Sequence, residues 1–278
     1  MSVKTRKKLR AILFFALKML AGLIVVAPLI YAALESFLPF GETMKNPPVL
    51  ISPNMGFQNY VQATKQVTVL TYFKNTLIVA FSTVGMQILT ASLAAYAFTF
   101  FNFKGKNLIF TLFLATMMIP DDTIMISNYL TISNMQLINT LFAVMLPYFA
   151  SGMSVFLMRQ YYVTIPMELK EASMIDGCGH MRFWAKIAVP LSMPAIASLA
   201  VYAFILSYNQ YLWPLLVTNS NNMRTVQVGI SMLFSREDGI NYALVMAGAM
   251  MVAVPAIIIF SFGQKYIIKG MTDGAVKG

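Results

Sequence analysis

Long apolar runs dominate this sequence and constrain its fold more than any other feature. A helix needs about 20 apolar residues to cross a bilayer, and six runs reach that length. Charged residues make up 11% of the chain and hydrophobic residues 58%, whereas soluble domains carry about 25% charged residues. The sequence therefore predicts an all-α membrane protein with six transmembrane helices. The six runs cover residues 19–38, 73–101, 108–130, 141–161, 191–217 and 242–268.

The third run is interrupted in its second half by Pro120, Asp121 and Asp122. This pattern is consistent with a short span followed by a second helix at the outer surface. Acidic side chains inside a membrane can form a proton relay, but this pair is better placed to cap the second helix at its N-terminus. Gln87 and Thr90, inside the second run, are compatible with either a transport path or helix packing.

Lys and Arg lie mostly between the apolar runs, at the N-terminus, in two of the connections and at the C-terminus. The positive-inside rule assigns these segments to the cytoplasm, so both termini are expected inside. The net charge of +10 is thus interpreted as a topology signal and not as a nucleic-acid patch. The first apolar run is longer than that of a signal peptide, so we interpret it as a first transmembrane helix that is not cleaved off. The predicted parts are a cytoplasmic N-terminus (1–18), a membrane domain (19–268) with outer loops 39–72 and 218–241 and a cytoplasmic loop 164–190, and a cytoplasmic tail (269–278).

No enzyme or nucleotide site is recognisable in the sequence. A P-loop needs the pattern G-x-x-x-x-G-K-[ST], and the nearest candidate, Gly105-Lys106, is followed by Asn107 and lacks the first glycine. Cys178 and His180 are the only residues of their types, which excludes an internal disulfide and ordinary multi-histidine metal sites. The spans hold no clustered acid, base or metal-ligand set. The sequence predicts a non-catalytic chain that binds no metal and no cofactor.

The loop at 164–190 carries more charged residues than any other connection between two apolar runs. Pro166 can occupy the first turn of a helix, and Leu169, Ala172 and Ile175 recur at a spacing that makes a narrow apolar face. Gly177 can end that helix because it tolerates a positive φ. A helix–turn–helix at the cytoplasmic surface is therefore expected. On these grounds alone it could be an ordinary loop whose basic side chains touch anionic headgroups.

The residue spacing in this loop narrows the interpretation. Glu171-Ala172-Ser173, three residues, Gly177, nine residues, then Ile187-x-Val189-Pro190 closely resembles the EAA loop of ABC importer permeases, EAA-x3-G-x9-I-x-L-P. Ser173 and Val189 are the departures from that pattern, and both are small changes in size. Further stretches resemble MalG-like subunits of carbohydrate-uptake importers. These are FKNTLIVA (73–80), MELKEASMIDG (167–177), NQYLWPLLVT (209–218) and KGMTDGAVKG (269–278).

The resemblance implies a type I ABC importer permease fold with a cytoplasmic coupling helix in the 164–190 loop. It also implies a multi-pass subunit of the cytoplasmic membrane that pairs with a second, non-identical permease chain. An ATPase dimer using ATP and Mg would sit below, and an extracytoplasmic solute-binding protein would deliver substrate. By the same resemblance, residues 218–241 face that binding protein and residues 269–278 face the ATPase. The implied ATPase-coupling residues are Glu171, Ala172, Ser173, Asp176, Gly177, Ile187 and Pro190.

Three residues in the middle of the fifth run are candidates for the substrate path. Polar side chains at this depth usually face a cavity or the bundle interior. Asn209 and Gln210 can bond sugar hydroxyls and Trp213 can stack on a sugar ring, with 209 and 213 on one helix face. The alternative is interhelical hydrogen bonding and a kink at Pro214.

The predicted function is import of a sugar or oligosaccharide, and the corresponding stretch of glycerol-3-phosphate importers is also similar. The alternative from a different class is a secondary transporter, which would predict inverted repeats and buried ionisable pairs. The sequence shows neither.

Overall fold

The structure, a computed structural model, describes residues 3–234 and 241–273, and within these ranges every regular element is a helix. Three helices are long and apolar enough to cross a membrane alone: residues 10–35 of α1 (Val3–Glu35), α4 (Val69–Phe100), and residues 242–265 of α15 (Tyr242–Asp273). Three further spans are bent pairs of helices, so six spans result when each pair is counted as one. By length and composition, this count agrees with the predicted six.

The bent pairs explain why the predicted boundaries are approximate. The pairs bend by 97°, 48° and 77° at their breaks. The first joins α5 (Lys106–Thr116) to α6 (Asp121–Asn134), and the second joins α7 (Leu141–Met145) and a 3₁₀ turn (Leu146–Tyr148) to α8 (Gly152–Tyr162). The third joins α10 (His180–Phe183), a π-helical turn (Trp184–Ala188) and α11 (Val189–Leu191) to α12 (Met193–Tyr208). The remaining helices are α2 (Phe40–Thr43), α3 (Gln58–Gln66), α9 (Met167–Ile175), α13 (Leu212–Val217), α14 (Val226–Ser231) and the 3₁₀ turn Met232–Phe234.

The break at Pro120 confirms the expectation that the third run is a short helix followed by a second one. Asp121 and Asp122 are the first two residues of α6, and Pro120 is its N-cap with no side-chain cap hydrogen bond. The predicted capping role is therefore wrong in detail, because proline occupies the cap position. The two carboxylates instead lie in the first turn, at the positive end of the helix dipole.

The chain divides into two compact units, residues 1–68 with 230–254 and residues 69–229 with 255–278. In the first unit the 39–72 loop is ordered by buried contacts. Asn59 Nδ2 donates to the carbonyl oxygens of Ser36 and Leu38, both at 2.8 Å. The Tyr60 ring lies against Phe37, with the two centroids 5.2 Å apart. These contacts fix the start of α3 against the end of α1.

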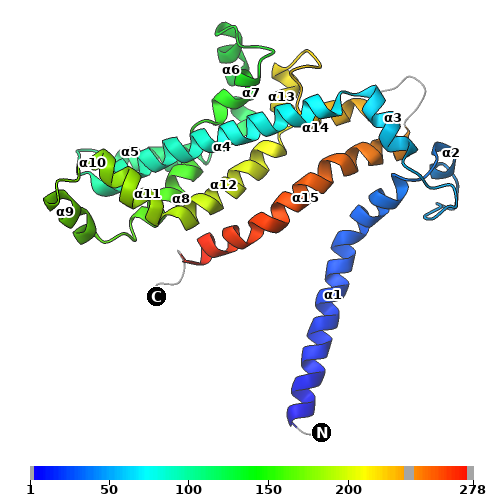
Figure 1. Cartoon of the computed structure of the whole chain (residues 1–278), viewed down its shortest axis with the longest axis horizontal. Coiled ribbons are helices and arrows are strands. Elements are labelled where there is room, and N and C mark those ends of the chain that lie inside the picture. Colours follow the sequence, from blue (N-terminus) through cyan, green and yellow to red (C-terminus); the bar gives the residue numbers. More distant parts are fainter. Residues whose placement is uncertain (1–2, 235–240, 274–278) are drawn as a thin grey trace. The chain divides into compact units, whose positions relative to one another are not determined.

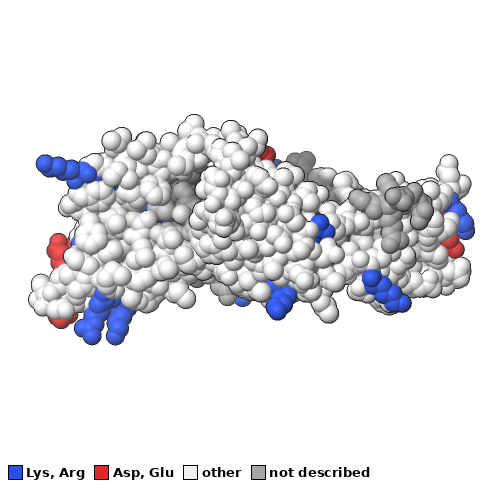
Figure 2. Space-filling model, turned by 90° about the horizontal axis from the view of Figure 1, so that it is seen from above, with Lys and Arg blue, Asp and Glu red and all other residues white. Residues whose placement is uncertain are grey.

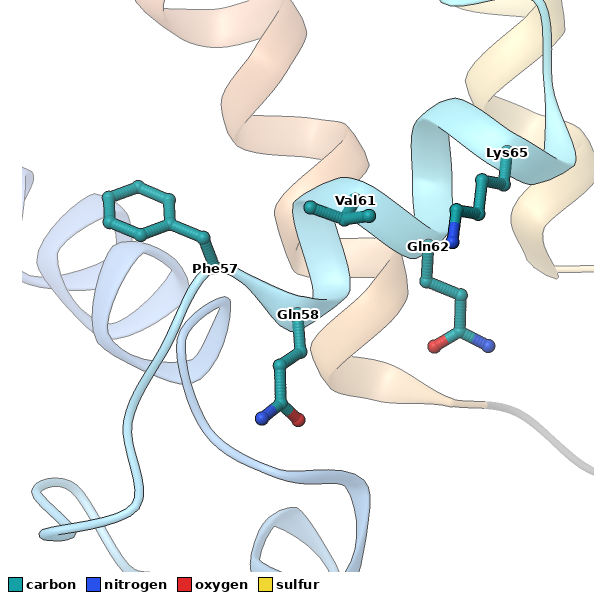
Figure 3. A pocket seen from close by; sticks show the side chains of 5 residues that line it. All are labelled: Phe57, Gln58, Val61, Gln62 and Lys65. Carbon is teal, nitrogen blue, oxygen red and sulfur yellow. The ribbon is translucent and has the colours of Figure 1, made fainter.

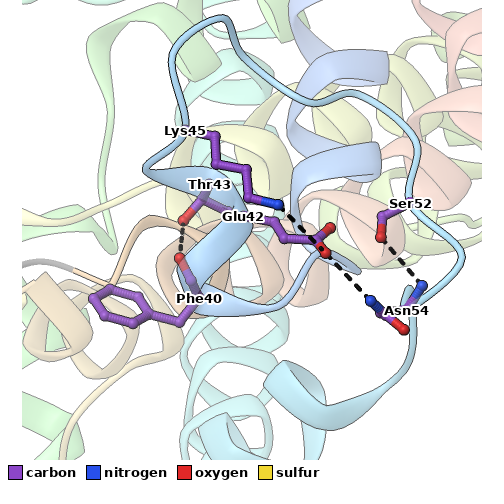
Figure 4. Close-up of polar contacts among 6 residues, drawn as sticks. All are labelled: Phe40, Glu42, Thr43, Lys45, Ser52 and Asn54. Carbon is purple, nitrogen blue, oxygen red and sulfur yellow. Dashed lines mark hydrogen bonds and ion pairs between the residues drawn. The ribbon is translucent and has the colours of Figure 1, made fainter.

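A polar cluster closes the same loop farther along the chain (Figure 4). The side-chain Nδ2 of Asn54 donates to Glu42 Oε1 at 3.3 Å, and the backbone N–H of Asn54 donates to Ser52 Oγ at 3.1 Å. Hydrogen bonding with Ser52 and Asn54, together with the nearby Lys45 ammonium, lowers the pKa of Glu42 from its usual value. Glu42 therefore stays ionised and can hold the loop closed.

One side of α3, together with its N-cap Phe57, borders a pocket that is open to the surface (Figure 3). Its residues mix apolar, amide and cationic side chains around a shallow pocket. They are Phe57, Gln58, Val61, Gln62 and Lys65.

In the second unit α4 packs against both α8 and α12 (Figure 1). One core cluster is built around Tyr96, Phe100, Tyr162 and Phe183, which are at most 4% exposed. A separate cluster contains Val79, Ala143, Trp213 and others. The face drawn in Figure 2 carries few charged side chains. This is the surface expected of helices in lipid.

Polar side chains of α4 form hydrogen bonds with the backbone carbonyl groups that are left free at the break inside the fourth span. Gln87 Nε2 donates to Tyr148 O and Thr90 Oγ1 donates to Phe149 O, both at 2.8 Å. Ser154 Oγ donates back to Gln87 Oε1 at 3.1 Å. In a bilayer no water is present to bond these freed carbonyl groups. Gln87 and Thr90 therefore have a structural role, which resolves the ambiguity left by the sequence.

Candidate functional site

The 164–190 loop folds as the expected helix–turn–helix. α9 begins at Met167, with Pro166 one residue earlier than expected, at the N-cap with φ −59° and ψ 136°. Glu168 lies in the first turn, where the helix dipole favours a carboxylate. Proline at the cap works because the residue there needs an extended ψ and no intrahelical N–H bond.

Gly177 ends α9 in the way that the sequence predicts. Its φ is +77°, a value that side chains disfavour. The amide of Gly177 donates to Met174 O at 3.0 Å and the amide of Cys178 donates to Ser173 O at 2.9 Å. These two bonds form a Schellman motif. A Cβ added at Gly177 would meet no atom within 4 Å, so the requirement for glycine is conformational and not steric.

The apolar face of α9 points away from the bundle. Ile175 is 87% exposed and Leu169 39%, and Ala172 is exposed as well. The inward side of α9 carries Ser173, which is 7% exposed, and Met174, which packs against the core cluster around Phe183. The second half of the loop is anchored: Phe183 is fully buried, Ile187 is half-buried and Pro190 is exposed. The expected face exists, but none of the residues that the structure describes covers it.

The inward side of α9 and α10 contacts the C-terminal end of α4. Lys170 Nζ donates to Phe100 O at 2.6 Å. His180 lies beside the same helix end, with its Nδ1 3.4 Å from Tyr96 Oη and its ring centroid 4.7 Å from that of Phe101. The spacing of the motif did not reveal these contacts, because Lys170 precedes the first motif position and His180 lies between two of them.

The three candidates in the fifth run do not lie on one helix. α12 ends at Tyr208, Asn209 is its C-cap, and α13 starts only at Leu212. The prediction that 209 and 213 share a helix face is therefore wrong. The physical reason is Pro214: it has no N–H to donate to the carbonyl of Gln210, and its ring clashes with that carbonyl in a continuous helix.

The environments of these residues also differ. Trp213 is 4% exposed, and its Nε1 donates to Ala143 O at 3.2 Å. Asn209 is exposed, and its Nδ2 bonds Ile205 O at 2.9 Å in its own helix. Gln210 has a buried Oε1 without a hydrogen-bond partner among residues 3–234 and 241–273. Of the three, Gln210 alone has an unused buried polar atom.

Three side chains that the sequence did not single out hold the described part of the 218–241 loop. Asn139 Oδ1 accepts from the amides of Asn219 and Ser220, both at 2.9 Å. Asn75 Nδ2 donates to Asn222 O at 2.8 Å and to Arg224 O at 2.9 Å. Thr76 Oγ1 accepts from the amide of Val226 at 2.8 Å. The sequence signal for these contacts was the presence of polar Asn and Thr side chains within or beside apolar runs. Residues 235–240 of this loop and 274–278 of the predicted tail lie outside the described residues.

The described residues form bent apolar helices with a surface helix that ends in a glycine turn, the features of a multi-span membrane protein. The family comparison identifies which kind. The chain belongs to the family of binding-protein-dependent transport system inner membrane components, whose model matches residues 87–273. It is therefore a multi-pass ABC importer permease, of a family that is generally non-catalytic.

Curated relatives span nearly the whole chain. The arabinooligosaccharides transport system permease protein AraQ of Halalkalibacterium halodurans is 37% identical over 258 residues, 92% of each chain. The sn-glycerol-3-phosphate transport system permease protein UgpE of Rhizobium meliloti is 32% identical over 259 residues, 90% of this chain and 92% of the relative. A crystal structure of a bacterial ABC transporter that imports alginate matches with a TM-score of 0.83 at 21% identity, covering 96% of this chain and 98% of the other. The family and the fold predicted from the EAA-like spacing are thereby confirmed.

Proposed function

We propose that this chain is the permease subunit through which an ATP-driven importer takes up a sugar or oligosaccharide, with α9 as the coupling helix. The observation that carries the coupling role is the uncovered apolar face of α9, where Ile175 is 87% exposed. The substrate class rests on the relatives: one at 37% identity is named for arabinooligosaccharides.

A protein partner fits this face better than a lipid surface does. α9 and its C-cap carry Glu168, Glu171 and Asp176 on exposed positions, whereas the cation Lys170 is turned toward Phe100. Anionic headgroups attract basic segments and repel carboxylates. An apolar stripe flanked by acids suits a cleft in a partner subunit. The motif positions Glu171, Ala172, Ser173, Asp176, Gly177, Ile187 and Pro190 are the proposed coupling residues.

The partner on this face is proposed to be the ATPase, as a dimer that uses ATP and Mg. The absence of a P-loop in the given sequence supports the proposal that ATP is hydrolysed on another chain. A second, non-identical permease would complete the pathway. The 218–241 loop would meet a solute-binding protein outside, and its tethering by Asn75, Thr76 and Asn139 gives it a defined shape for that contact.

For the substrate path, Gln210 is the strongest of the three candidates. A buried amide oxygen without a partner costs free energy, and a sugar hydroxyl could supply the missing bond. Asn209 is exposed beside it and could add a second contact. Trp213 is committed to Ala143 O, so its proposed contribution is to shape the path rather than to stack on a sugar.

The experiment that tests the function is purification with the neighbouring subunits, followed by a screen of MgATP hydrolysis. Arabinotriose is expected to stimulate hydrolysis when the matching binding protein is present. Stimulation by glycerol 3-phosphate alone would support the second candidate, which the similarity to UgpE favours. Hydrolysis that responds to no sugar and no glycerol phosphate would contradict both.

The proposed orientation places both termini and the 164–190 loop in the cytoplasm. Cys178 is the only thiol, and it is half-buried. An impermeant maleimide should label it in inverted vesicles and not in intact cells. The matched control is Lys45→Cys in a Cys178→Ser background, because the Lys45 side chain is 58% exposed in the proposed outer loop. Labelling of Cys178 in intact cells would contradict the proposed orientation.

A further inference from the structure

The C-terminal end of α4 is held by lysines from two different segments. A helix end leaves its last carbonyl groups without intrahelical partners, and the dipole places partial negative charge there. Lys106 Nζ donates to Phe101 O at 3.0 Å, a contact five residues apart in the sequence. Lys170 Nζ donates to Phe100 O at 2.6 Å, from seventy residues away. Only the second contact joins α4 to the 164–190 loop.

The hydrogen bond of Lys170 has a charged donor, and that ammonium group is partly shielded from solvent by two aromatic rings. Its ammonium lies 5.9 Å from the ring centroid of Phe100 and 5.7 Å from that of Phe101, so cation–π attraction adds to the hydrogen bond. Lys170 is half-buried, and a hydrogen bond to a charged group is stronger than one between neutral groups. Ser173, on the same inward side of α9, donates its Oγ to Lys170 O at 2.7 Å.

α10 approaches the same end of α4. The ring of Phe183 lies 5.5 Å from that of Phe100, and the His180 ring lies 4.7 Å from that of Phe101. Both halves of the helix–turn–helix therefore meet α4 at one place, which Figure 1 shows at the α9–α10 end of α4. α4 in turn packs along α8 and α12.

We propose that Lys170 is a positioning residue that fastens α9 to the C-terminal end of α4, so that α4 moves together with the coupling helix. This inference rests on the proposed coupling function of α9. α9 then makes contacts on two sides. Leu169 and Ile175 face the proposed ATPase, and Lys170 faces the other helices of this chain. The covalent chain connects α9 to α8 and α10, and Lys170 adds a connection to the span that packs against α8 and α12.

The test uses the assembled complex in proteoliposomes, with arabinotriose uptake and MgATP hydrolysis measured together. Lys170→Met keeps most of the aliphatic stem and removes the donor. We expect normal assembly and continued hydrolysis, with arabinotriose uptake per ATP lowered roughly tenfold, the size of one lost charged hydrogen bond. Lys170→Arg should restore most of it. Lys106→Met, which disturbs the same helix end without touching α9, should stay within about twofold of wild type.

The outcomes separate this inference from the coupling function. Normal uptake per ATP in an assembled Lys170→Met complex would overturn the fastening role. If Glu171→Lys and Gly177→Val still lose uptake in that case, the coupling function stands. If those two variants also transport normally, the coupling function is wrong.

A second measurement needs no substrate and tests the shared movement of α4 and the loop even if Lys170→Met fails to assemble. Phe101→Cys and His180→Cys, in a Cys178→Ser background, place two thiols where the rings now meet. If α4 and the loop move together, bridging these thiols should leave MgATP hydrolysis unchanged. Loss of hydrolysis on bridging, with recovery on reduction, would show that the two must separate and would refute the proposal.

Discussion

The turn after α9 and the break before α13 are both interruptions of a helical chain, but they are held by different kinds of contact. The first is closed by its own backbone: Gly177 and Cys178 donate to carbonyls three and five residues back. The second is caused by Pro214, but it is held in place from far away in the sequence, because Trp213 Nε1 donates to Ala143 O across seventy positions. A local turn needs only the right residue at the right place, whereas a tertiary break needs the rest of the bundle.

This difference sets what each region can do. The α9 turn can keep its shape while α9 moves as a body, which suits a joint between subunits. The α12–α13 break is held at Trp213 by the bond to Ala143 O, and the buried Oε1 of Gln210 has no partner among the described residues. This combination would suit a wall of the proposed substrate path with one polar atom available. Variants in the two regions should therefore fail in different ways.

The largest effect is expected at Gly177. Gly177→Val forces a β-branched residue to a φ of +77°, a strain of roughly 1–3 kcal/mol that the turn can relieve only by reorienting α9. We expect arabinotriose uptake to fall at least about tenfold, with the chain still present in the membrane. The matched control is Gly179→Val, since Gly179 has an ordinary φ of −67° and free space around its Cβ position. Equal loss in both variants would contradict the conformational explanation.

Reversing the charge of Glu171 tests the same joint without altering the turn. Glu171 is exposed, so Glu171→Lys should leave the chain folded and in the membrane. We expect loss of uptake because the proposed docking surface then carries the wrong sign. Glu168→Lys, one turn earlier on α9, shows whether the effect belongs to the motif position or to the overall charge. Normal uptake by Glu171→Lys would contradict a role of this motif position in docking.

A large effect of a different kind is expected at Trp213. Trp213→Ala removes a buried ring and leaves a cavity, a change that costs about 3–5 kcal/mol in protein cores. The expected result is less folded complex in the membrane, with near-normal uptake per assembled complex. Trp213→Phe, which keeps most of the volume and loses only the bond to Ala143 O, should recover much of the amount. Normal assembly with impaired uptake would instead assign Trp213 to the path.

The comparison also shows how far the sequence could be interpreted. Six spans, the family and the glycine turn were predictable, because run length, motif spacing and the φ preference of glycine are local properties. The break after Tyr208 was missed although Pro214 is visible in the sequence, since a proline can also be absorbed as a kink. The outward direction of Ile175 and the contact of Lys170 with Phe100 could not be predicted. Each depends on which side of α9 the bundle covers.

The smallest effects, and the sharpest test of the proposed wall, are expected at Gln210 and Asn209. Gln210→Ala removes the unpartnered buried amide, so we expect normal assembly and a several-fold fall in arabinotriose uptake per complex, on the order of 1 kcal/mol for one hydrogen bond. Asn209→Ala should have a weaker effect, because its amide is exposed and already bonds Ile205 O. Uptake must be normalised to assembled complex, since the packing explanation predicts a change in amount alone. If Gln210→Ala leaves the normalised uptake unchanged while Asn209→Ala lowers it, the unsatisfied oxygen of Gln210 is not the contact and the path runs along the exposed end of α12.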